Sequence, residues 1–277
     1  MVIDAHQHFW KFDPVRDSWI DNNMKILQRD FLPPELKTLL ADNGMDACIA
    51  VQADQSETET HFLLNLAAQH DFIRGVVGWV DLQAENIEER LAYFAQFQKI
   101  KGFRHIVQGE ADVNFMLRPA FKRGIAHLEK FGLTYDILIF PHQMGAALEL
   151  VKTFPNQKFV IDHLAKPYIK DGYYDGWAAL LRELGHCENV WCKISGLVTE
   201  ADWTHWQYGQ FVPYLDQAFD VFGCERLMYG SDWPVSLLGG SYGQVKGILG
   251  QYLQPFSPQE KDKIWGENAG VFYGLEY

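Results

Sequence analysis

Residues 2–9 read Val2-Ile3-Asp4-Ala5-His6-Gln7-His8-Phe9, an apolar run that carries two histidines one residue apart. If this run is a strand, the alternation of side chains points both imidazoles to the same face. The histidines would then lie at the carboxyl end of the first strand of the fold, which is the end that carries the chemistry in α/β enzymes. The stretch therefore predicts a first strand and a ready pair of metal ligands.

Short runs of β-branched and aromatic residues recur between longer amphipathic stretches. Helical patterns cover residues 33–40, with prolines at the start, and residues 119–131, which end before Gly132. Alternation of strand and helix places the strands parallel to one another. Eight such runs in 277 residues predict a single (β/α)8 TIM-barrel domain over residues 1–277, with an open doubly wound sheet as the alternative. Against that alternative, no Gly-x-Gly-x-x-Gly or Walker-type loop follows the first run. The eight runs surround Ile3, Ile49, Val76, Phe103, Tyr135, Val160, Cys192 and Met228.

Charge and hydropathy exclude several classes of partner. The formal net charge is −12 and no run of Lys or Arg stands out, which argues against nucleic acid and anionic membranes. Residues 137–140 are among the longest apolar runs and are far too short to span a bilayer, and the first residues lack the features of a signal peptide. The four cysteines have no paired spacing and indicate buried free thiols. We expect a cytoplasmic protein with a small-molecule substrate; the pattern identifies no oligomer interface.

Two further strand ends carry metal-ligand side chains. One apolar run ends in His163, and the last run delivers Asp232. If the barrel closes, the first and eighth strands are neighbours, so His6, His8 and Asp232 meet although they come from opposite ends of the sequence. Histidine nitrogens with one carboxylate suit Zn²⁺, and an open position on the ion lowers the pKa of bound water to about 7. The pattern thus predicts a hydrolase; the alternatives are a hydrogen-bonded polar pair for the histidines and a turn role for Asp232.

Other strand ends supply candidates for contact with a substrate. Arg104 and His105 end the fourth run, and one of them should face inward and polarise a carbonyl oxygen, with a strand-end salt bridge as the alternative. Asp136 interrupts the apolar fifth run and either binds substrate or makes a structural hydrogen bond. Lys193 and Ser195 in the seventh run have no base at a spacing that indicates a nucleophile.

Aromatic residues and two polar segments are expected around the barrel mouth. Residues 11–30 and 167–176 interrupt the alternation and predict loops that grip a substrate. Three tryptophans at strand ends would pack either on a small ring substrate or against the barrel rim: Trp10, Trp79 and Trp233.

The chain resembles the amidohydrolase superfamily, and within it the lactonase branch. The resemblance extends over almost the whole chain, and that branch contains hydrolases of L-fuconolactone, L-rhamnonolactone and 2-pyrone-4,6-dicarboxylate. It implies a (β/α)8 barrel and attack by water on an ester carbonyl. The motifs that carry it are His6-Gln7-His8, Asp162-His163-Leu164-Ala165-Lys166-Pro167, Gly230-Ser231-Asp232-Trp233-Pro234 and the terminal Glu267-Asn268-Ala269-Gly270-Val271-Phe272-Tyr273.

The resemblance also implies roles for individual residues. Asp232 would activate the water and later protonate the departing ring oxygen, while His6, His8 and His163 would bind a metal together with Asp232 or contact the lactone carbonyl. Asp136 stands where many metal-dependent relatives carry a histidine, so one divalent ion, zinc in first place, or no metal at all is expected rather than a binuclear centre.

The leading functional hypothesis is hydrolysis of a small neutral aldonolactone to its acid. Few arginines are expected to face the site, whereas a dicarboxylate substrate would require several cationic side chains. The alternatives are a metal-dependent decarboxylase or a pyrone-dicarboxylate lactonase of the same superfamily, and a barrel that binds a sugar acid without catalysis.

Overall fold

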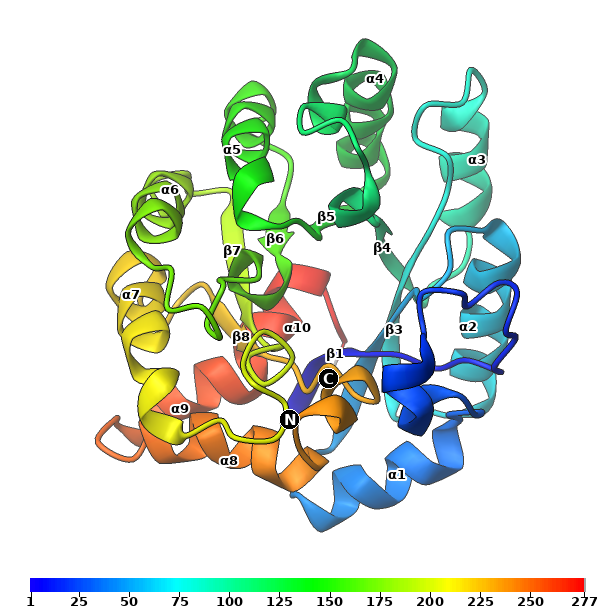
Figure 1. Cartoon of the computed structure of the whole chain (residues 1–277). Helices are drawn as coiled ribbons and strands as arrows, with labels where there is room; N and C mark the ends of the chain where they lie inside the picture. Colours follow the sequence, from blue (N-terminus) through cyan, green and yellow to red (C-terminus); the bar gives the residue numbers. More distant parts are fainter. Residues whose placement is uncertain (277) are drawn as a thin grey trace.

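Eight parallel strands form a single sheet in which each strand pairs with the next one in the sequence (Figure 1). The structure is a computed structural model and describes residues 1–276. The predicted (β/α)8 architecture is confirmed, and each of the eight predicted runs contains a strand. The strands are β1 (Ile3–Gln7), β2 (Ala47–Val51), β3 (Ile73–Gly78), β4 (Ile100–His105), β5 (Thr134–Ile137), β6 (Phe159–Ile161), β7 (Val190–Ile194) and β8 (Leu227–Tyr229).

The barrel closes between the first and last strands through residues that follow β8. Gln7 and Trp233 form a parallel bridge, and the backbone N–H of His8 donates to the carbonyl of Trp233 at 2.7 Å. The backbone N–H of Asp232 donates to the carbonyl of His6 at 2.8 Å. Closure therefore brings the two ends of the sequence together at the carboxyl ends of the strands.

Helices surround the barrel, and their ends follow from local sequence. Two prolines occupy the first turn of α1, where their missing N–H groups cost no hydrogen bond. The chain after α4 continues as a 3-10 turn (Glu129–Phe131) that stops at Gly132, whose φ of 66° suits glycine. The helices are α1 (Pro33–Asp42), α2 (Glu57–Gln69), α3 (Ile87–Phe94), α4 (Pro119–Leu128), α5 (Met144–Thr153), α6 (Asp175–Gly185), α7 (Val212–Phe222), α8 (Tyr242–Tyr252), α9 (Pro258–Asp262) and α10 (Asn268–Tyr273).

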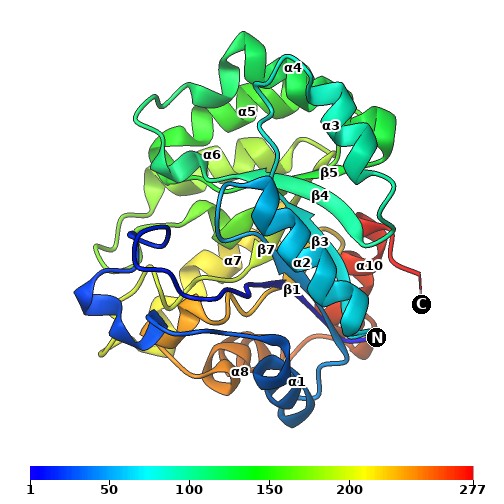
Figure 2. The ribbon, with the colours of Figure 1, turned by 90° about the vertical axis from the view of Figure 1, so that its right-hand side faces the viewer.

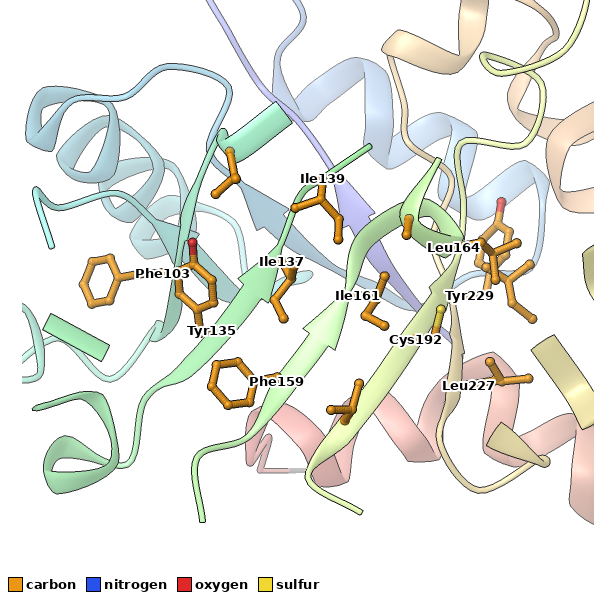
Figure 3. Packing of buried hydrophobic residues seen from close by; sticks show 14 of the residues in the cluster. Phe103, Tyr135, Ile137, Ile139, Phe159, Ile161, Leu164, Cys192, Leu227 and Tyr229 are labelled. Atoms are coloured by element: carbon orange, nitrogen blue, oxygen red, sulfur yellow. The ribbon is translucent and has the colours of Figure 1, made fainter. Parts of the chain in front are cut away.

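Alternation along each strand sorts side chains between two apolar layers. Side chains such as Phe103, Tyr135 and Cys192 point away from the barrel axis and join the layer between strands and helices (Figure 3). A smaller cluster inside the barrel contains Ile3 and Val77, and α10 adds apolar side chains to it. Figure 2 shows α10 near the N terminus, at the end of the barrel where the strands begin. The opposite end is left for the polar residues of the site.

No helix among the described residues is both long enough and apolar enough to cross a membrane.

Candidate active site

Four residues at the carboxyl ends of β1, β6 and β8 form a group that we call the mouth cluster: His6, His8, His163 and Asp232. His6 lies on β1, and the other three follow the strands that the sequence predicts. His163 and Asp232 have φ values of 54° and 56°, in the left-handed region that non-glycine residues rarely adopt. Such backbone strain concentrates at functional sites, where surrounding structure holds it in place.

The side chains of the mouth cluster converge on one carboxylate oxygen. Asp232 Oδ1 lies 3.5 Å from His8 Nε2, 3.8 Å from His163 Nε2 and 4.0 Å from His6 Nε2. All four residues are buried. The predicted meeting of His6, His8 and Asp232 across the closed barrel is therefore what the structure shows, and His163 joins them.

The outer nitrogens of the imidazoles have fixed partners. His8 Nδ1 donates to the carbonyl of Val51 at 2.8 Å, so the proton is on Nδ1 and Nε2 keeps its lone pair. His163 Nδ1 lies 2.8 Å from the hydroxyl of Ser195. A Cβ on Gly196 would come within 2.8 Å of the His163 ring, so glycine is required at that close approach. These contacts orient both rings with Nε2 toward Asp232.

His6 is held by charged neighbours inside the barrel. Its Nδ1 lies 3.2 Å from Asp162 Oδ1 and 3.1 Å from Lys193 Nζ, and its Nε2 lies 3.2 Å from an Arg104 nitrogen that can only donate. The donor at Nε2 favours a lone pair on that nitrogen, whereas Nδ1 lies between the Asp162 carboxylate, which accepts, and the Lys193 ammonium, which donates.

Burial sets the protonation states of the mouth cluster. Burial holds the pKa of His6 and of His163 well below the usual range, despite the nearby carboxylates. Burial also acts to raise the pKa of Asp232, but His163, His8 and Lys166 outweigh it, and that pKa is lowered. At neutral pH His6 and His163 are therefore neutral, and Asp232 is an ionised carboxylate.

This donor set fits a divalent cation. One ligand atom each from His6, His8 and Asp232 lies within 4.8 Å of the others, and the Nε2 atoms of His6 and His8 are 3.2 Å apart. Nitrogen lone pairs beside a carboxylate, with the outer imidazole nitrogens hydrogen-bonded, are typical of zinc sites. A second group of possible metal ligands consists of His6, Asp162 and His163. The Asp162 carboxylate in it is already paired with Arg104 at 3.0 Å and with Lys193 at 3.0 Å.

The mouth cluster opens into a cavity of about 460 Å³ at the carboxyl ends of the strands. Its wall is mainly apolar and aromatic with a few polar groups, as in many small-molecule sites. The lining residues are His8, Trp10, Trp19, Ala53, Arg104, Ile106, Gln108, Gly109, Leu138, Phe140, His163, Lys166, Asp232 and Val235.

A family model described as amidohydrolase matches residues 3–275. The chain belongs to the amidohydrolase family. An L-fucono-1,5-lactonase of Burkholderia multivorans is 39% identical over 99% of this chain and 96% of that protein. An L-fucono-1,5-lactonase of Burkholderia ambifaria is 35% identical over the same shares. A crystal structure of an amidohydrolase from Burkholderia multivorans with bound zinc is 40% identical over the full length of both chains, with a TM-score of 0.97.

Arg104 and His105 end β4 of this amidohydrolase, and only one of the two side chains points toward the cavity. Arg104 points inward and lines the cavity, as one of the two was expected to. His105 points outward instead: its ring stacks on Phe115, and its Nε2 lies 2.8 Å from Glu110 Oε1. Phe103 packs among the helices, so strand alternation sends Arg104 in and His105 out. The prediction of His105 as a substrate contact is not supported by this placement.

Two of the three predicted tryptophans also lie outside the cavity of the amidohydrolase. Trp79 Nε1 donates to the outward-facing His105 at 3.3 Å. Trp233 is fully buried and packs edge-on against Phe9 and Phe31, because the backbone turns at Asp232. For both residues the structure favours the alternative of rim packing. Trp10 does line the cavity, as predicted.

Asp136 lies deeper in the barrel, where its role is structural. Its Oδ2 lies 2.5 Å from Lys193 Nζ and accepts a hydrogen bond from Tyr273 of α10 at 2.8 Å. Asp136 does not line the cavity, so the hydrogen-bonding alternative fits and substrate binding does not. We call the fixed charges below the mouth cluster the interior cluster: Arg104, Asp136, Asp162 and Lys193.

Three further side chains, to which the sequence pattern assigns no role, belong to this site. Trp19 lines the cavity from the predicted loop of residues 11–30, and Lys166 lines it from the motif that carries His163. Ser195 contacts His163, although no base stands near it in the sequence. The signal for Lys166 is its place in that motif, three residues after His163. No local pattern marks Trp19.

Proposed function

We propose that the chain is a hydrolase that opens a small sugar lactone to its acid by attack of water on the ester carbonyl. The observation that carries the proposal is the Asp232 carboxylate, which lies within 4.0 Å of three imidazole nitrogens at the edge of a substrate-sized cavity. The two Burkholderia relatives described above support the same chemistry, since both are named L-fucono-1,5-lactonase.

Asp232 is the group that moves protons. As a carboxylate it takes a proton from the attacking water while the new bond forms at the carbonyl carbon. The bond between that carbon and the ring oxygen then breaks, and Asp232 returns the proton to the departing oxygen. The product is a hydroxy acid, whose carboxyl group loses its proton to solvent at neutral pH.

The imidazoles of His8 and His6 suit cation binding better than direct contact with a carbonyl oxygen. The Nδ1 proton of His8 is donated to the Val51 carbonyl, so in the neutral ring Nε2 carries a lone pair and has no proton for a developing oxyanion. We therefore propose that His6, His8, His163 and Asp232 hold one divalent ion, with zinc the first choice. When bound, such an ion polarises a carbonyl and lowers the pKa of water.

The cavity wall favours a neutral substrate. Arg104 lines the cavity, but its guanidinium is already bound to Asp162 at 3.0 Å and to the Gln52 side chain at 3.0 Å. Trp10 and Trp19 lie edge to face with ring centroids 6.1 Å apart and offer apolar surface to the C–H face of a sugar ring. A dicarboxylate would require several cationic partners, whereas this wall offers Lys166 beside the engaged Arg104.

A proton-release assay across L- and D-aldonolactones tests the proposal. The protein is assayed as purified, after chelation, and after reloading with zinc, manganese or magnesium, with metal content measured each time. We expect turnover of an aldonolactone and loss of that turnover on chelation, restored by a divalent ion. Pyrone dicarboxylate and aromatic carboxylates, the latter followed by CO₂ release, test the alternatives. Failure of every aldonolactone would overturn the proposal, and full activity without metal would remove the ion from it.

A further inference from the structure

Lys166 is held at the cavity wall by an unusual stretch of backbone. Residues 163–166 all have positive φ, and Lys166 itself has φ of 50°. Four consecutive non-glycine residues in the left-handed region are costly, so other contacts must fix this turn. The turn places the Lys166 side chain in the wall of the cavity that contains Asp232 and His163.

The ammonium of Lys166 has a carboxylate partner outside the mouth cluster. Its Nζ lies 3.1 Å from Glu200 Oε1, and the two side chains are 16% and 13% exposed. The carbonyl of Glu200 accepts a hydrogen bond from the backbone N–H of Lys170 at 3.0 Å, which ties the segment after β7 to the segment after β6. Lys166 Nζ also lies 5.5 Å from the ring centroid of Phe140, another wall residue.

Of the two cationic side chains in the cavity wall, Lys166 is the one that can exchange its carboxylate partner for a ligand. Arg104 is almost fully buried, and its two terminal guanidinium nitrogens donate to Asp162 and to Gln52. Lys166 contacts the Glu200 carboxylate at the edge of the cavity and carries three donors on a flexible stem. A new carboxylate in the cavity could therefore take up another donor of Lys166 or replace Glu200.

The proposed reaction creates such a carboxylate. We propose that Lys166 binds the carboxylate of the ring-opened product and that Glu200 competes for the same ammonium, so that the pair sets how long the product stays bound. The inference rests on the proposed lactone hydrolysis, in which a neutral substrate becomes an anion. Glu200 keeps the Lys166 charge compensated before the reaction and displaces the product afterwards.

The test measures binding of L-fuconate by calorimetry, with the uncharged L-fucitol as the matched ligand, and product inhibition during turnover of L-fuconolactone. We expect Lys166→Met to raise the L-fuconate Kd about tenfold or more, because a charge-assisted hydrogen bond is lost, and to leave L-fucitol binding within about twofold. Lys166→Arg should retain most of the difference between the two ligands. Glu200→Gln should tighten L-fuconate binding severalfold and increase product inhibition.

Lys170→Met is the control, since Lys170 is exposed on the same segment. It should leave both Kd values unchanged, and thermal unfolding of each variant shows whether it is folded. Any metal contribution to carboxylate binding is common to all variants, so the comparison between variants isolates Lys166.

Unchanged L-fuconate affinity in a folded Lys166→Met variant would overturn the inference, even if the wild type hydrolyses lactones. Equal weakening of L-fuconate and L-fucitol would do the same, because it would show a loss of shape rather than of charge. Weaker L-fuconate binding in Glu200→Gln would overturn the competing role of Glu200. Absence of lactone turnover in the wild type would count against the proposed function, which the calorimetry does not require.

Discussion

The interior cluster and the mouth cluster lie a few ångströms apart in the barrel. They differ in whether their polar atoms already have partners within the protein. In the interior cluster every charge has a fixed partner of opposite charge: Lys193 binds Asp136 and Asp162, and Arg104 binds Asp162. In the mouth cluster the outer nitrogens of His8 and His163 are bonded, whereas His8, His163 and Asp232 line a cavity with their remaining polar atoms. A closed set of charges supports the fold, and an open set is available to a ligand.

The two carboxylates of the interior cluster differ in their pKa values. Burial raises the pKa of Asp136 to about 6 against the effect of Lys193. For Asp162 burial acts in the same direction, but Lys193, His6 and Arg104 prevail and hold its pKa well below the usual range. His6 belongs to the mouth cluster and contacts Asp162 and Lys193 of the interior cluster. The interior cluster therefore positions the mouth cluster through His6.

Replacement of Asp232 by Asn is the change with the largest expected effect on catalysis. The side chain keeps its size but cannot accept the proton of water, so we expect kcat to fall about 10²- to 10⁴-fold. Thermal unfolding should stay near the wild-type temperature, because the site is not built for stability. Retention of more than a tenth of the wild-type kcat would show that Asp232 is not the base and that the contrast between the clusters is wrong.

Replacement of Lys193 by Met tests the interior cluster in the opposite way. Two carboxylates would remain buried without their shared cation, and removal of one partner of a buried ion pair costs about 3–5 kcal/mol. We expect a large fall in the free energy of unfolding in urea, and partial recovery in Lys193→Met with Asp136→Asn. A folded single variant with unchanged stability would mean that the interior charges are not what holds this part of the barrel together.

The sequence predicted the elements and the mouth cluster because both depend on regular geometry. Strand and helix periodicity determined the barrel, and barrel closure determined that residues 6 and 232 become neighbours. Alternation along β4 also explains why Arg104 faces inward and His105 outward. The apolar Phe103 belongs to the helix-facing layer, so its neighbour Arg104 faces the barrel interior. The basic pair alone does not decide which of its members faces inward, because the phase of β4 is set by that apolar residue.

The remaining site residues depend on features without a local pattern. Trp233 follows a residue with positive φ, which turns its ring away from the cavity toward Phe31. Trp19 reaches the cavity from a segment with no regular periodicity. Ser195 contacts His163, which follows β6 and is 32 residues away in the sequence. Partner choice among buried charges, such as Asp136 with Lys193, follows from packing across the barrel and not from spacing along the chain.

Replacement of Ser195 by Ala should have a smaller effect on the mouth cluster than loss of Asp232. The His163 ring would lose its outer partner but keep its place against Gly196. Loss of such an outer contact typically lowers activity or metal affinity about 10- to 100-fold. We expect kcat/KM for the lactone to fall within this range, with partial restoration in Ser195→Thr. No change in activity or metal content would show that the outer contact does not position His163.

Replacement of Tyr273 by Phe is the mildest test of the interior cluster, because it removes one hydrogen bond to Asp136 and leaves the ring in place. Loss of the bond should lower the free energy of unfolding by about 1 kcal/mol at pH 8, with kcat for the lactone unchanged. The folded-state pKa of Asp136 is raised, so its ionisation destabilises the fold as pH increases through about 6. Tyr273 donates to the ionised form and reduces that cost, hence Tyr273→Phe should be less destabilising at pH 5 than at pH 8. Urea unfolding of both proteins at the two pH values gives the difference. An equal effect at the two pH values would mean that Asp136 stays ionised throughout and that Lys193 controls its charge.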